Sequence, residues 1–138
     1  MALKTLIVGW NEIGELPELE IYELPIKIDT GAKTSSLHAT GIEMFTKNHQ
    51  QWVKFKTKNS KGQIISIEKE IFDQREVTSS NGQTQSRFVI KTPLCLGGQT
   101  WDIELTLTDR KKMRFSMLLG RRAMKNIQVS PMEENLLS

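Results

Sequence analysis

The sequence is poor in the residues that bind metals and form cross-links. It has one cysteine and two histidines among 138 residues, so an internal disulfide is excluded. A zinc site needs three or four cysteine, histidine or carboxylate ligands that converge at short spacings. His38 and His49 are far apart, and Cys95 lies in an apolar stretch that favours a buried, inert thiol. We therefore expect no metal ion.

Long apolar runs and nucleotide-binding loops are missing too. No stretch approaches the about 20 apolar residues of a membrane-spanning helix, so we expect no membrane partner. The apolar run within residues 1–10 is too short for the core of a signal peptide. There is no Gly-x-x-x-x-Gly-Lys-Ser/Thr loop to hold a nucleotide. We expect no cofactor and a cytoplasmic location.

Charge gives little support for nucleic-acid binding. The net charge is only +3, from 19 basic and 16 acidic residues. A segment near the C-terminus is nevertheless basic and lacks carboxylates, so it could bind nucleic acid or an acidic partner. We favour the simpler interpretation, solvated charges at a hairpin tip and on an exposed helix. The basic residues are Arg110, Lys111, Lys112, Arg114, Arg121, Arg122 and Lys125.

The hydrophobic pattern predicts one β-rich domain that spans residues 1–138, with a tail after about residue 130 that frays. Asn81-Gly82 and Gly97-Gly98 are typical of hairpin turns, and only residues 121–125 look helical. From Trp101 to Leu107 every second residue is apolar, which predicts a strand with one buried face. The other predicted strands cover residues 6–10, 22–28, 52–57, 64–72, 76–79, 85–90 and 115–120.

The run Asp29-Thr30-Gly31-Ala32 is the most informative part of the sequence. It follows the apolar run Leu24–Ile28, which places a carboxylate on a tight turn at the end of a strand. Gly31 lets the backbone approach without side-chain bulk, and a rigidly held aspartate suits acid–base chemistry. An Asp-x-Gly turn is also ordinary turn chemistry. A second element is therefore needed before the turn indicates a function.

That second element is Leu118-Leu119-Gly120, at the end of a predicted buried strand that leads into the short helix. Together, the two motifs resemble those of the retropepsin-like aspartic peptidases. More closely, the sequence is similar to a bacterial family of small proteins labelled ATP-dependent zinc proteases. That similarity also covers Val8-Gly9-Trp10, Leu16–Leu19 and Ile26–Ala39. The residues support neither the zinc nor the ATP of that label.

The resemblance implies a mostly-β fold, a closed barrel of the acid-protease type with one short C-terminal helix. It implies that Asp29 is the catalytic residue and that Thr30, Gly31 and Ala32 complete the active-site turn. Leu118, Leu119 and Gly120 would pack beside this turn, and Arg121 would contribute to a dimer contact. The polar hairpin tip with Ser80, Asn81, Gly82 and Gln83 would be the flap over the substrate.

A second Asp-Thr-Gly or Asp-Ser-Gly is absent, because Asp73, Asp102 and Asp109 precede other residues. The family's chemistry uses two carboxylates, so the resemblance implies a homodimeric aspartic endopeptidase that pairs two copies of Asp29. Its partner would be a peptide or protein substrate. Arg122 and the long segment 39–72 depart from the family pattern. The alternatives are a non-catalytic peptide- or protein-binding module and, less favoured, a nucleic-acid-binding accessory protein.

Overall fold

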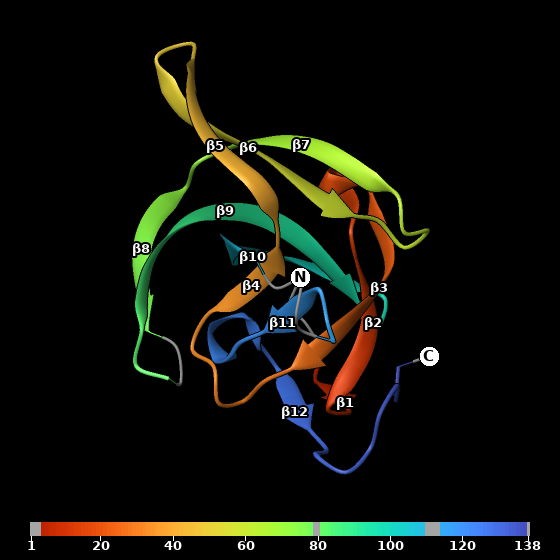
Figure 1. Ribbon diagram of the computed structural model, residues 1–138. Helices are drawn as coiled ribbons and strands as arrows, with labels where there is room; N and C mark the ends of the chain where they lie inside the picture. The colour runs from red at the N-terminus through yellow and green to blue at the C-terminus, as the bar shows by residue number, and fades with distance from the viewer. Residues whose placement is uncertain (1–3, 79–80, 110–113, 138) are drawn as a thin grey trace.

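Strands make up most of the protein. The structure, a computed structural model, describes residues 4–78, 81–109 and 114–137 (Figure 1). Its elements are β1 (Leu6–Val8), β2 (Asn11–Leu16), the 3₁₀ helix η1 (Pro17–Leu19), β3 (Ile21–Ile28), β4 (Ser35–His38), β5 (Thr40–Lys47), β6 (Gln50–Lys58), β7 (Ile64–Glu70), β8 (Asp73–Thr78), β9 (Thr84–Leu96), β10 (Gln99–Thr108), β11 (Met117–Leu119), the 3₁₀ helix η2 (Arg121–Ala123) and β12 (Ile127–Val129).

Six strands close into a barrel. The large sheet has the order β10-β4-β11-β3-β2-β9-β8, and an additional β9–β10 pairing joins its two sides. β8 lies outside this ring and pairs with β9. The predicted closed β-barrel is therefore confirmed. The seam between β2 and β9 is narrow, because its register contains a single residue pair, Glu15 with Cys95.

The core follows from the alternation of apolar side chains along the strands. Trp101, Ile103, Leu105 and Leu107 on β10 are all buried, as the sequence predicts. β9 and β10 are joined through Gly97 and Gly98, whose φ angles are +58° and +76°. Both glycines occupy the left-handed region that a two-residue hairpin turn requires.

Strands β5, β6 and β7 form a separate three-stranded sheet, seen at the top of Figure 1. They account for most of the long segment 39–72, and the sequence did not predict β5. The inward side of β6 carries Val53 and Phe55, both fully buried in the common core. The opposite side carries alternating lysines, which is the pattern of a sheet with one solvated face.

The C-terminal helix is shorter than predicted. η2 is a single 3₁₀ turn that ends at Ala123, whereas the sequence predicted helix as far as Lys125. The chain reverses at Asn126, which has a φ of +55°, and enters β12. β12 then pairs in parallel with β1. The tertiary pairing of residues 127–129 therefore ends the helix early.

The segment after residue 130 is hydrogen-bonded to the N-terminal part of the chain. The Glu12 carboxylate, on β2, is fully buried. It accepts hydrogen bonds from the backbone N–H groups of Gly9 (2.7 Å), Leu136 (2.8 Å) and Leu137 (3.1 Å). One buried side chain thus connects both ends of the described chain.

No helix within the described residues is both long enough and apolar enough to span a bilayer.

We predict that Glu12→Gln lowers the free energy of unfolding by about 1–3 kcal/mol. An amide keeps the shape of the carboxylate, but its NH₂ group faces backbone donors and leaves at least one of them unsatisfied. Thermal and urea denaturation measure the effect. The matched control is Glu15→Gln on the same strand, whose half-buried side chain accepts none of these bonds. Equal losses in the two variants would contradict the role given to Glu12.

Candidate active site

Asp29 comes directly after β3 and is held by a network of short hydrogen bonds. Its own N–H donates to the Leu119 carbonyl at 2.9 Å, and its carbonyl accepts from the Ala32 N–H at 3.2 Å. The Gly31 N–H donates to Asp29 Oδ1 at 2.9 Å, which fixes the orientation of the carboxylate. The side chain is half-buried, so it keeps access to solvent.

β11 lies between the strand that enters the turn and the strand that leaves it. Leu118 and Leu119 pair in parallel with Lys27 and Ile28 on β3. On its other side, β11 pairs antiparallel with β4. The structure therefore brings the two predicted motifs together, although about 90 residues separate them in the sequence.

Gly120 is the point of closest approach between the motifs. A Cβ atom built there would lie 2.6 Å from the backbone C and O atoms of Thr34. Only glycine allows this contact without a shift of the turn. The Gly120 N–H also donates to Ser35 Oγ at 3.0 Å within the buried interior.

Arg121 supports the turn within the same chain. Its Nη1 atom donates to the Thr30 carbonyl at 2.9 Å, and its backbone N–H donates to the Ala32 carbonyl at 2.8 Å. The next N–H, of Arg122, donates to the Lys33 carbonyl at 3.1 Å. These contacts brace the turn from η2. A dimer contact through Arg121 stays a prediction.

The other aspartates of the described chain lie outside this turn. Asp73 begins β8, where the Gln74 backbone N–H and then the Arg75 side chain lower its pKa. Asp102 is on β10, and Asp109 lies 3.7 Å from His38 Nδ1. Among the aspartates that the structure describes, Asp29 is thus the one on a tight turn that is braced by β3, β11 and η2.

The described residues contain no group of three His, Cys, Asp or Glu side chains that could hold a metal ion.

The predicted flap corresponds to the connection between β8 and β9. Thr78 and Thr84 face each other at its base, and Gly82 has a φ of +84°. Asn81, Gly82 and Gln83 are exposed, whereas Ser80 lies outside the described residues. The hairpin exists, and its role as a flap stays a prediction.

With this geometry in place, comparison with known sequences gives a clear result. The profile of the RimB-like family, described as "Retropepsin-like aspartic endopeptidase RimB", matches residues 7–137. The chain belongs to the RimB-like family. The predicted resemblance to retropepsin-like aspartic peptidases is therefore confirmed.

The curated relatives of this RimB-like chain are longer proteins. It is 40% identical to a protein of Shewanella pealeana over 129 residues, which cover 91% of this chain and 28% of that protein. It is 41% identical to a protein of Desulfotalea psychrophila over 121 residues, which cover 86% and 26%. Both relatives carry the name "Probable alpha-L-glutamate ligase". The chain thus spans little more than a quarter of their length.

A solved structure has the same fold as this RimB-like chain. It is the crystal structure of a protein of unknown function from Legionella pneumophila, with a TM-score of 0.80 and 29% sequence identity. The match covers 96% of this chain and 98% of the other.

Two residues near the turn were not predicted as part of it from the sequence. Ser35 stood only within the matching segment Ile26–Ala39, yet its Oγ accepts a hydrogen bond from the Gly120 N–H. Trp10 accepts a bond from the Ile28 N–H at 2.8 Å, and its ring packs edge-on against Phe115 with Arg114 nearby. Their partners are distant in the chain, so no local pattern could have identified these contacts.

We predict that Gly120→Ala destabilises the Asp29 turn, at a cost of about 1–3 kcal/mol, because the new methyl group overlaps the Thr34 backbone. Hydrogen–deuterium exchange of residues 29–36 should rise strongly. The control is Gly62→Ala, which places an alanine in an open turn at a φ of +76°. It should lower the free energy of unfolding by a similar amount, about 1–2 kcal/mol. It should leave exchange at residues 29–36 unchanged. Equal exchange in the two variants would argue against Gly120 as the brace.

Proposed function

We propose that this chain is an aspartic endopeptidase that hydrolyses peptide bonds with a water molecule activated by two copies of Asp29. The observation that carries the proposal is the turn itself. Its half-exposed carboxylate is oriented by the Gly31 N–H and tied to β11 by its own backbone. Membership of a family described as retropepsin-like aspartic endopeptidases supports the same chemistry.

The chemistry needs a second carboxylate close to the first. Two carboxylates about 3 Å apart do not both ionise, so one keeps a proton. The ionised aspartate then takes a proton from water as the oxygen attacks the carbonyl carbon, while the protonated one hydrogen-bonds the carbonyl oxygen. Collapse of the tetrahedral intermediate breaks the C–N bond, and the amine leaves with a proton. A C2 homodimer supplies the second Asp29 from the partner chain.

The names of the relatives suggest a substrate to test first. A segment similar to this chain forms part of proteins named as α-L-glutamate ligases. We therefore propose α-linked glutamyl peptides as the first candidates for cleavage. The same observation favours the second candidate function, a non-catalytic module that binds a peptide for an associated ligase.

We expect Asp29→Asn to lower the rate of peptide cleavage by about 10²–10⁴-fold, because an amide cannot accept and return the proton of water. The assay follows cleavage of α-linked oligoglutamate and of an unfolded polypeptide by mass spectrometry between acidic and neutral pH. Asp102→Asn is the control, since this exposed carboxylate lies on β10. If neither parent nor variants cleave but all bind the peptide equally, the binding-module alternative holds.

We also expect the active species to be a dimer that buries about 1,200–2,000 Å². The sharpest measurement mixes parent protein with an about tenfold excess of Asp29→Asn and allows subunits to exchange. Most parent subunits are then in mixed dimers that contain only one Asp29, so the cleavage activity per parent chain should fall strongly. An enzyme that works as a monomer would keep its full activity, and sedimentation would show one small species.

A further inference from the structure

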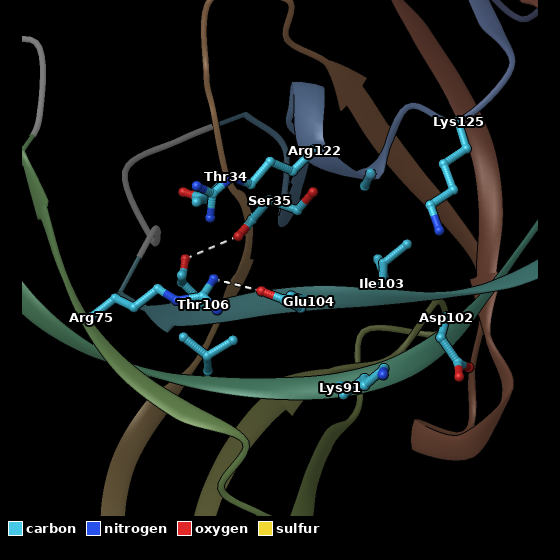
Figure 2. Close-up of a pocket in the computed structure, with 12 residues that line it drawn as sticks. Thr34, Ser35, Arg75, Lys91, Asp102, Ile103, Glu104, Thr106, Arg122 and Lys125 are labelled. Carbon is cyan, nitrogen blue, oxygen red and sulfur yellow. Dashed lines mark hydrogen bonds and ion pairs between the residues drawn. The ribbon is translucent and has the colours of Figure 1, made fainter.

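One side of the β8–β9 hairpin faces the segment that follows the Asp29 turn. Along β8, every second residue from Asp73 to Val77 is half-buried, and the residues between them are exposed. Arg75, one of the half-buried residues, lines a cavity of about 180 Å³ together with Thr34 and Ser35 (Figure 2). We call this half-buried side of the hairpin its inward side.

Arg87 lies on the same inward side. It is the partner of Arg75 in the antiparallel register of β8 and β9, and directly opposed residues share one face of a sheet. Gln85, two residues earlier on β9, also lies on this face. Its Oε1 atom accepts hydrogen bonds from Thr108 Oγ1 at 3.2 Å and from Arg87 Nε at 3.0 Å. These bonds hold the Arg87 guanidinium beside the end of β10.

The Arg87 guanidinium is half-buried and has no acidic side chain as a partner. Asp73 and Glu104 pair with Arg75 instead, at 2.7 Å from its Nε atom and 2.5 Å from its Nη1 atom. All 16 acidic side chains belong to described residues, and none of them forms an ion pair with Arg87. Burial lowers the pKa of the Arg87 guanidinium, because the charged form loses hydration there.

The free donors of Arg87 have the geometry that a carboxylate needs. The Nε atom is engaged with Gln85, whereas the two Nη groups donate to no atom that the structure describes. A guanidinium binds a carboxylate through two parallel hydrogen bonds, and such charge-assisted bonds are strong. A ligand carboxylate would also compensate for the hydration that the side chain has lost.

We propose that Arg87 binds a glutamate side chain of the peptide substrate and is the residue that selects acidic peptides. This assignment rests on the proposed function of the Asp29 turn. Arg87 acts here by binding and takes no part in proton transfer. Its loss should therefore raise KM for a glutamyl peptide more than it lowers kcat.

The test measures peptide binding in the Asp29→Asn protein, where cleavage does not compete. Fluorescence anisotropy follows labelled α-linked oligoglutamate and an oligoglutamine of the same length, at neutral pH and constant ionic strength. We expect the added substitution Arg87→Gln to weaken oligoglutamate binding by about tenfold, because it removes a charge-assisted contact. Binding of the neutral oligoglutamine should change by less than about twofold.

The matched control is Lys54→Gln, on the exposed side of β6. It removes the same charge far from the hairpin in sequence and should change oligoglutamate affinity by less than about twofold. The thermal midpoint of each variant is measured alongside, so that a folding defect is recognised. An equal loss of affinity in Lys54→Gln and Arg87→Gln would indicate nonspecific attraction to net charge and would overturn the assignment.

Two other outcomes would also overturn it. One is the absence of saturable oligoglutamate binding, and the other is an equal effect of Arg87→Gln on both peptides. Failure of the proposed function gives a different result. The parent protein would then cleave no peptide, while Asp29→Asn would still bind oligoglutamate in a manner that depends on Arg87. That result would support the role of Arg87 within a binding module.

Discussion

The hydrogen bond from the Asp29 N–H to the Leu119 carbonyl is the interaction on which the candidate site depends. It joins two segments that are neighbours only because β11 inserts between β3 and β4. The close packing of Gly120 on Thr34 then fixes how near the segments lie. Without that approach, the turn would keep its local hydrogen bonds but lose its place in the barrel. The carboxylate is thus positioned by tertiary structure and oriented by local structure.

Local chemistry explains which parts could be predicted from the sequence. The alternation along β10, the two glycines at 97 and 98, and the Asp-Thr-Gly turn are all short-range signals. Leu119 and Ile28 pair in parallel and are far apart in the sequence. Their proximity could therefore be expected from the resemblance to a family but not from periodicity. β5 was missed because its exposed, mixed composition has no clear alternation.

Other features could not be predicted because they exist only after folding. Glu12 looks like an ordinary charged residue, yet three backbone donors from both ends of the chain converge on it. The early end of η2 results from the pairing of β12 with β1, which outweighs the good helix propensity of Met124 and Lys125. Likewise, Arg75 on β8 forms ion pairs with its neighbour Asp73 and with Glu104 on β10. The pair with Glu104 joins two strands that are close only in the folded barrel.

The seam between β2 and β9, with its single residue pair, also bears on how the barrel fluctuates. Proteins open locally where the fewest hydrogen bonds must break, and such openings occur far more often than global unfolding. The strands that hold Asp29 are β3, β4 and β11, and none of them forms this seam. The barrel can therefore open locally between β2 and β9, at Glu15 and Cys95, while the Asp29 turn keeps its geometry. Local opening and the fixed geometry of the turn thus belong to different strands of the same seven-stranded sheet.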